Sequence, residues 1–282
     1  MPPSRRELLR HTLAGLLYAA AAPAAVGTLA GCGRDGPSAA PIRDEGRLAT
    51  ARWPGQRPRW LLVRPDPARV PRPHLVVALH GRGGSADDVI SLGLDEQAVA
   101  AGVALAAVDG GERYWHPRRG GEDTGAMVVE DLLPVLREHG VAAGPIGLTG
   151  LSMGGYGALW LAIRYGPRVI GAVATQGAAL WTSPGASAAG AFDDRADFVA
   201  HDVFAAVERL RAIPVHLACG DKDPFVAANK SLAQRLPHAV TTFDEGGHDD
   251  AYWRPHAAAA VRWLAAVAAP GPSSSLPRPA VS

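Results

Sequence analysis

A five-residue segment at positions 150–154 constrains this chain more than any other feature. It reads GLSMG, and it lies between an apolar run at 145–149 and a run at 156–163 whose composition suits a helix. A strand that turns sharply into a helix holds the central serine, Ser152, on a strained turn with its hydroxyl exposed. Both flanking glycines are required, because a Cβ on either side would clash in so tight a turn. The segment therefore predicts a nucleophilic serine at the end of a strand.

The composition is that of an ordinary globular protein. The chain has 282 residues, of which 48% are hydrophobic and 20% charged, and its formal net charge is +1. These values allow a sizeable core, and the charge pattern does not indicate a nucleic-acid partner. We expect one α/β domain at residues 51–269. The segments 33–50 and 270–282 lack apolar periodicity, so they are predicted to be a flexible tether and a disordered tail.

The first 32 residues resemble the export signal of a bacterial lipoprotein. Arg5 and Arg6 form a twin-arginine-like pair, an apolar run follows from about residue 12 to residue 30, and the run ends in LAGC at Cys32. The resemblance implies that Cys32 is acylated and that the protein is held at the outer face of the cytoplasmic membrane. A plain transmembrane anchor or an uncleaved signal is the alternative. The other cysteine, Cys219, lies in an apolar run and is predicted to be a buried strand residue.

Short apolar runs alternate with helical patterns through the rest of the chain. Helical spacing of i, i+3, i+4 and i+7 occurs at residues 129–136 and again at 257–264, where Pro255 suits the first turn. Several of the predicted strands are continuous apolar runs, as expected for strands buried on both faces. This alternation predicts a mostly parallel sheet with helices on both faces and a site at the carboxyl ends of its strands. The predicted strands are 60–63, 74–79, 103–108, 146–149, 169–174, 215–219 and 239–243.

A serine hydroxyl becomes a nucleophile when a base takes its proton and a third group orients the base. His248 is the candidate base, because it follows the last predicted strand and precedes the last predicted helix. Asp223 follows the strand at 215–219 and is the candidate acid, with Asp221 as the competing carboxylate. The alternative role for either carboxylate is to cap a turn or a helix. The chain order Ser, Asp, His is that of α/β-hydrolases.

An oxyanion hole requires two backbone N–H groups near the nucleophile. Met153 supplies one, because it follows Ser152 at the start of the predicted helix. We assign the second to Arg82 in the segment HGRGG at 80–84, with Gly81 or Gly83 as alternatives. His80, at the start of this segment, is predicted to be structural.

Three segments resemble those of the esterase D / S-formylglutathione hydrolase / antigen 85-like superfamily of α/β-hydrolases. They are GLSMGGYGAL at 150–159, GHDDAYWR at 247–254 and LHGRGGSADD at 79–88, which is also similar to oxyanion loops of secreted esterases and polyester depolymerases. The resemblance implies an α/β-hydrolase fold and hydrolysis of carboxylic esters or thioesters through an acyl-enzyme. Alternatives are an acyltransferase, a serine peptidase and a non-catalytic surface lipoprotein. The site residues that the resemblance supports are Ser152, His248, Asp223, Met153 and Arg82.

Two tryptophans, Trp115 and Trp181, are candidate walls of a substrate pocket, because each follows a predicted strand. Arg118 and Arg119 are candidate contacts for an acidic group of the substrate. The alternative is that Trp115 packs on the core and that the arginines are solvated. No cofactor is expected, and no metal site, since the sequence around His248 lacks paired ligands at helical spacing. The expected partner is a small-molecule or lipid-like ester.

Overall fold

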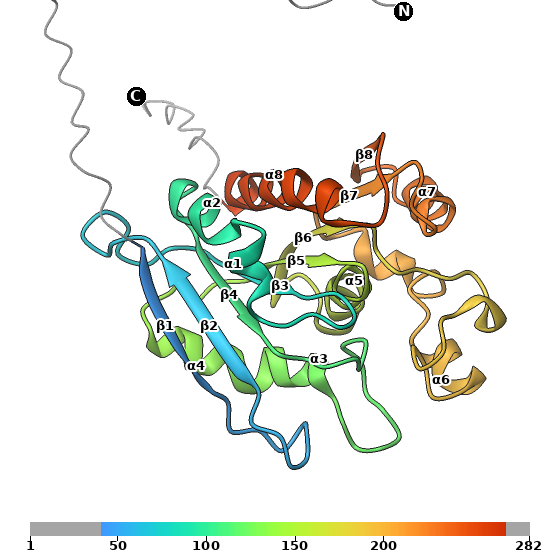
Figure 1. Cartoon of the computed structure of the whole chain (residues 1–282), viewed down its shortest axis with the longest axis horizontal. Helices are drawn as coiled ribbons and strands as arrows, with labels where there is room; N and C mark the ends of the chain where they lie inside the picture. Colours follow the sequence, from blue (N-terminus) through green and yellow to red (C-terminus); the bar gives the residue numbers. More distant parts are fainter. Residues whose placement is uncertain (1–40, 269–282) are drawn as a thin grey trace, which may run out of the picture. The chain divides into compact units, whose positions relative to one another are not determined.

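Eight strands pair into one sheet in the computed structural model, which describes residues 41–268 (Figure 1). They are β1 (Ile42–Arg47), β2 (Arg59–Arg64), β3 (Leu75–Leu79), β4 (Ala104–Val108), β5 (Ile146–Leu151), β6 (Ile170–Gln176), β7 (Val215–Gly220) and β8 (Val240–Asp244). Their order across the sheet is β1-β2-β4-β3-β5-β6-β7-β8. Only the pairs β1–β2 and β2–β4 are antiparallel. The carboxyl ends of the six parallel strands, β3 to β8, therefore lie at one edge of the sheet.

Helices cover both faces of this sheet. On one face lie α1 (Asp88–Ser91), α2 (Leu94–Ala100) and α8 (Asp250–Ala268), and α5 (Met153–Tyr165) packs against β5 and β6 from the other (Figure 1). The predicted α/β architecture is confirmed. The remaining elements are α3 (Thr124–Ala126), the π-helix η1 (Met127–Leu132), α4 (Leu133–Glu138), α6 (Arg195–Ala200), α7 (Val226–Arg235) and the 3-10 helices η2 (Pro184–Ala186) and η3 (Val207–Leu210).

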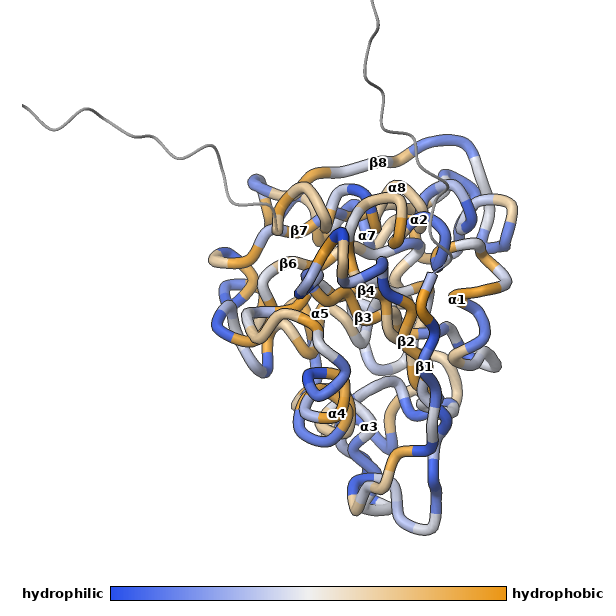
Figure 2. Tube along the Cα trace, turned by 90° about the vertical axis from the view of Figure 1, so that its left-hand side faces the viewer, coloured by the Kyte–Doolittle hydropathy of each residue, from blue (hydrophilic) through white to orange (hydrophobic). Residues whose placement is uncertain are grey.

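The inner strands contribute alternate residues to two hydrophobic cores. Leu75 and Val77 of β3 belong to the core with α5, whereas Val76 and Ala78 belong to the core with α2 and α8. Successive side chains of a strand point to opposite faces, and every residue of β3 is buried. Hydrophobic colouring accordingly follows the inner strands in Figure 2. This double burial is why these strands are continuous apolar runs in the sequence.

The domain begins earlier than predicted, because residues 42–47 form the edge strand β1 and not part of a tether. Its side chains alternate between exposed and half-buried, so no apolar run marks it. Backbone pairing with β2 holds it, together with ion pairs from Arg64 to Asp44 and from Arg59 to Glu45. The predicted signal with Cys32 and the predicted tail at 270–282 lie outside the described residues. Across residues 41–268, no helix has both the length and the apolar character needed to span a membrane.

The last helix also begins earlier than its proline suggests. It starts at Asp250, so Pro255 lies in the interior of α8 and not in its first turn. The carboxylate of Asp249 accepts a hydrogen bond from the backbone N–H of Tyr252, and its carbonyl accepts from Trp253. These bonds satisfy N–H groups that a helix start leaves without a helical partner.

Candidate active site

Ser152 occupies the sharp turn that the sequence predicts. It follows β5 directly and is the N-cap of α5, with φ 50° and ψ −112°, a strained backbone conformation for a residue that is not glycine. A Cβ on Gly154 would lie 1.9 Å from the carbonyl oxygen of Leu79, and one on Gly150 would lie 2.2 Å from the carbonyl oxygen of Gly154. The two glycines therefore let the start of α5 pack directly onto backbone.

We expect Gly154→Ala to destabilise the fold strongly. The new methyl group would push α5 away from β3, and overpacking against rigid backbone costs about 3 kcal/mol or more. Urea unfolding would measure the change. The matched control is Gly144→Ala, because no atom lies within 4 Å of a Cβ built at Gly144; its effect should stay within about 1 kcal/mol. Equal stability of the two variants would contradict the role assigned to Gly154.

The imidazole of His248 lies between Ser152 and Asp223. Its Nε2 is 2.8 Å from Oγ of Ser152, and its Nδ1 is 2.6 Å from Oδ2 of Asp223. An ionised carboxylate only accepts hydrogen bonds, so Nδ1 carries the proton and Nε2 accepts from the serine hydroxyl. The three residues follow β5, β7 and β8, which bring them together at the carboxyl edge of the sheet. This arrangement allows His248 to take the proton of Ser152 while Asp223 holds the ring.

The Asp223 carboxylate is buried, and its side chain has an exposed fraction of 0%. Its second oxygen accepts a hydrogen bond from the backbone N–H of Phe225 at 2.7 Å, which fixes its orientation. The competing carboxylate, Asp221, is exposed and accepts instead from the N–H of Gly246 at 3.2 Å. Asp221 therefore braces the loop that leads to His248, as a turn carboxylate does.

The loop at 80–84 passes close to Ser152 and is anchored by His80. The ring of His80 is buried, and its Nε2 accepts a hydrogen bond from the N–H of Gly110 at 2.9 Å. Its Nδ1 therefore carries the proton and donates to the carbonyl of Gly81 at 2.7 Å. Burial lowers the pKa of His80, which favours this neutral ring. His80 thus has a structural role in holding the loop. The loop runs close to the nucleophile, because a Cβ built on Gly81 would lie 3.7 Å from Cβ of Ser152.

Both residues predicted to supply N–H groups to the oxyanion hole belong to segments that adjoin Ser152. Met153 opens α5, and Arg82 belongs to the loop at 80–84 that lines the same cleft as Ser152. Among the described residues, neither backbone N–H donates to another protein group. The side chain of Arg82 pairs with Glu112 through a 3.0 Å contact. Both N–H groups are thus free to bind a ligand.

An open cleft of about 500 Å³ lies above Ser152 and His248. Three aromatic residues that were not predicted as site residues line it, namely Tyr114, Phe225 and Trp253. Phe225 and Trp253 both pack against the ring of His248, with centroids 5.2 and 4.9 Å away. Phe225 follows Asp223 and Trp253 follows His248 within a few residues in the sequence. This proximity could have been used to predict them as walls of the cleft.

Trp115 does not line the cleft, so its predicted role as a pocket wall is wrong. Its side chain is wholly buried. It occupies space that Gly157 of α5 leaves open, because a Cβ on Gly157 would lie 2.4 Å from the indole. Tyr114 and Trp115 both have positive φ, at 55° and 58°, and this backbone turns Tyr114 into the cleft. Trp181 lies one layer behind the lining residues, packed against Tyr114 and Phe225 with centroids 5.8 and 5.5 Å away.

The two arginines after Trp115 both have protein partners, but only Arg118 is buried, whereas Arg119 remains exposed to solvent. Arg118 pairs with Asp193 at 2.8 Å and also donates to the carbonyl of Ala191, and Arg119 pairs with Asp194. These bonds fasten the loop after β4 to the segment between β6 and β7. Neither arginine is among the residues that line the cleft.

The chain matches known esterases in sequence. A model of the Esterase family matches residues 56–264. An acetyl esterase of Caldicellulosiruptor saccharolyticus is 31% identical over 142 residues, which are 42% of this chain and 53% of that protein. The chain therefore spans about half the length of this curated relative.

Solved structures of several other proteins have a similar fold over most of this chain. FphF, a fluorophosphonate-binding serine hydrolase of Staphylococcus aureus, matches with a TM-score of 0.69 at 14% identity, over 80% of this chain and 98% of that one. An S-formylglutathione hydrolase from Agrobacterium tumefaciens matches with a TM-score of 0.66 at 16% identity, over 80% and 95%. A ferulic acid esterase matches with a TM-score of 0.65 at 17% identity, over 80% and 98%. The predicted α/β-hydrolase fold is confirmed.

Proposed function

We propose that this chain, which belongs to the Esterase family and is a carboxylic ester hydrolase, works through an acyl-enzyme on Ser152. The observation that carries the proposal is the continuous hydrogen-bonded chain from Ser152 through His248 to Asp223, at 2.8 and 2.6 Å. In it, a hydroxyl, a base and an orienting carboxylate lie in the order that acyl transfer requires. Ser152 and His248 both line a cleft that is large enough for a small organic ester.

In the acylation step, Oγ of Ser152 attacks the ester carbonyl while Nε2 of His248 takes its proton. The carbonyl oxygen becomes an oxyanion, which the N–H groups of Met153 and Arg82 bind. The new imidazolium is stabilised by Asp223 through Nδ1. Collapse of the tetrahedral intermediate breaks the bond to the alkoxy group, and His248 returns the proton to the departing alcohol. The products of this step are the alcohol and an acyl ester on Ser152.

Deacylation repeats these steps with water as the nucleophile. Nε2 of His248 takes a proton from the water, whose oxygen attacks the acyl carbonyl, and the oxyanion forms at the same two N–H groups. His248 then protonates Oγ of Ser152, which leaves, and the carboxylic acid is released. The cleft is open at Ser152, so water reaches the acyl-enzyme without movement of a lid.

The cleft favours a small or lipid-like ester with an apolar portion. Tyr114, Phe225 and Trp253 give it aromatic walls near Ser152, and Leu92 adds an aliphatic one. The acetyl esterase and the ferulic acid esterase among the similar proteins are named for ester substrates. Charged side chains, including Asp88 and Asp250, line the same cleft and suit a substrate with a polar end.

Product analysis tests the proposal. The purified protein should hydrolyse p-nitrophenyl esters of several acyl lengths, releasing acid and alcohol in equal amounts, and should leave the matching anilides almost intact. Preferential anilide cleavage would indicate a peptidase. Diversion of most of the acyl group to an added alcohol would indicate an acyltransferase. Labelling by a fluorophosphonate without turnover of any ester would contradict the hydrolase assignment.

We further propose that the protein is exported and anchored to the membrane through Cys32. The paired arginines, the apolar run and LAGC in the first 32 residues support this localisation. Cys32→Ser should remove the acyl mass and move the protein from the membrane fraction to the soluble fraction, because two acyl chains hold a protein firmly. Cys219→Ala is the control that keeps the anchor. Equal membrane retention of Cys32→Ser and the unaltered protein would rule the anchor out.

A further inference from the structure

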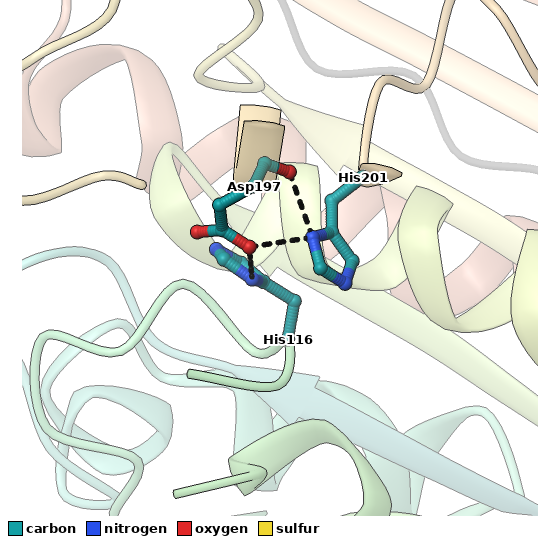
Figure 3. Close-up of side chains that lie close together, drawn as sticks. All are labelled: His116, Asp197 and His201. Carbon is teal, nitrogen blue, oxygen red and sulfur yellow. Dashed lines mark hydrogen bonds and ion pairs between the residues drawn. The ribbon is translucent and has the colours of Figure 1, made fainter. Parts of the chain in front are cut away.

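Two histidines and an aspartate converge at a place outside the active site. His116 lies on the loop after β4, Asp197 belongs to α6, and His201 follows the end of α6 (Figure 3). Oδ1 of Asp197 is 2.8 Å from Nδ1 of His201 and 3.8 Å from Nδ1 of His116. The two imidazole rings are 4.6 Å apart between centroids. One carboxylate oxygen and two imidazole nitrogens thus face a common point.

His116 is buried, Asp197 and His201 are half-buried, and a hydrogen bond orients the carboxylate. The side chain of His116 has an exposed fraction of 0%, and those of Asp197 and His201 have 12% and 14%. Oδ2 of Asp197 accepts a hydrogen bond from the N–H of Asp193 at 2.7 Å, which leaves Oδ1 to face the histidines. The nearby cation, Arg118, is paired with Asp193. This is a shaped polar site and not a solvated surface group.

The ring of His116 has one hydrogen-bond acceptor too many. Its Nδ1 is 3.0 Å from the carbonyl oxygen of Pro117, and its Nε2 is 3.0 Å from that of Ala191. A neutral imidazole carries a single N–H, so only one of these two nitrogens can donate. One nitrogen lone pair therefore faces an oxygen lone pair inside the protein. Such a buried mismatch is costly unless a cation lies between the atoms.

We propose that His116, Asp197 and His201 bind a divalent transition-metal ion, with Zn²⁺ as the preferred occupant. Imidazole nitrogens and one carboxylate are ligands that suit Zn²⁺. The Nε2–H of His116 would donate to Ala191, which leaves its Nδ1 lone pair for the metal. A metal-bound histidine commonly donates its other N–H to a backbone carbonyl in this way. The ion would replace the repulsion at Nδ1 with a bond.

The spacing of the three ligand atoms suits such an ion after a small adjustment. Bonds of about 2.0–2.1 Å in tetrahedral geometry separate neighbouring ligand atoms by about 3.3 Å. The distances from Asp197 to His201 and to His116, 2.8 and 3.8 Å, lie on either side of this value. Nδ1 of His201 also lies 2.9 Å from the backbone carbonyl oxygen of Asp197. His201 would therefore change tautomer and give up this contact, because its Nδ1 must bind the metal and its proton must move to Nε2.

The ion would join two segments that form part of the cleft. His116 lies on the loop that carries Tyr114, and Asp197 and His201 lie in the segment that carries Ala188; both Tyr114 and Ala188 line the cleft. A bound metal would therefore fix the distance between these two walls without touching Ser152. The expected role is structural, and the inference does not depend on the proposed reaction.

Metal binding to the full chain tests the inference directly. After treatment with a chelator, the protein should take up one Zn²⁺ per chain in competition with a chromogenic chelator. Co²⁺ in its place should give the visible absorption of a four-coordinate site. Saturation should raise the Tm by roughly 5–10 °C, as expected for a ligand at about a hundred times its Kd. Absence of stoichiometric uptake would overturn the proposal.

Variants locate the ion. His201→Gln and Asp197→Asn should each weaken Zn²⁺ binding by at least about tenfold. The control His139→Gln should not, although His139 also lies beside a carboxylate, 3.6 Å from Asp44. One equivalent of Zn²⁺ should leave the rate of fluorophosphonate labelling unchanged, which separates this site from His248. Binding that survives in both cluster variants, or that blocks labelling, would refute the assignment.

Discussion

Ser152→Ala should lose ester turnover almost completely while keeping its fold. We expect kcat/KM to fall by roughly 10⁴–10⁶-fold, because removing the serine of such a triad eliminates the covalent route. Among the described side chains, the hydroxyl hydrogen-bonds to Nε2 of His248, and the turn that holds it is set by Gly150 and Gly154. The Tm should therefore change little. Initial rates with p-nitrophenyl esters would measure the loss of turnover, and labelling by a fluorophosphonate would measure the loss of the nucleophile.

The control for this variant is Ser183→Ala. Ser183 is exposed and its side chain does not cap the 3-10 helix that follows it. Its replacement should leave both the turnover and the labelling intact. Labelling of Ser152→Ala at the rate of the unaltered protein would show that a different residue is the nucleophile.

Asp223→Asn should have the second largest effect, lowering kcat by about 10⁴-fold with little change in KM. The amide group of asparagine would donate to Nδ1 of His248, so the ring would carry its proton on Nε2. That tautomer offers no lone pair to Ser152, and the first proton transfer would fail. Steady-state kinetics and a crystal structure of the variant would separate this electronic effect from a displaced ring.

Asp221→Asn is the matched control, because Asp221 lies two residues away and does not contact His248. Its Oδ1 accepts from the N–H of Gly246, and an amide oxygen does this equally well. Activity should remain within about threefold of the unaltered protein.

Residues that act as one unit have non-additive effects. Ser152→Ala with Asp223→Asn should therefore be no slower than Ser152→Ala alone, and an additive loss would argue against a shared mechanism.

Most of the sheet could be predicted from the sequence, because its inner strands are buried on both faces. The runs at 74–79 and 103–108 match β3 and β4 to within one residue. The strand that was missed, β1, has the sequence IRDEGR and lies at the edge of the sheet. Edge strands with charged side chains carry little apolar signal, since backbone pairing holds them. Their detection requires knowledge of the partner strand.

Local pattern placed Ser152, Asp223 and His248 near one another because each follows a predicted parallel strand. The walls of the cleft could not be predicted in this way. Tyr114 reaches the cleft and Trp115 the core through two consecutive residues with positive φ, a conformation that bulky aromatic residues rarely adopt. The cluster of His116, Asp197 and His201 was missed because His116 meets the other two only through the packing of the loop after β4 against α6.

The strand that precedes His248, β8, lies at the edge of the sheet and has little burial to hold it. β8 pairs with β7 alone, and none of its five residues is buried, with Val240 exposed to 46%. Local opening at such an edge needs less free energy than melting the body of a domain. On gradual warming, the ring of His248 should move out of hydrogen-bonding distance of Ser152 before either hydrophobic core unfolds. We therefore expect heat inactivation to precede the loss of secondary structure, and brief cooling to restore full catalytic competence.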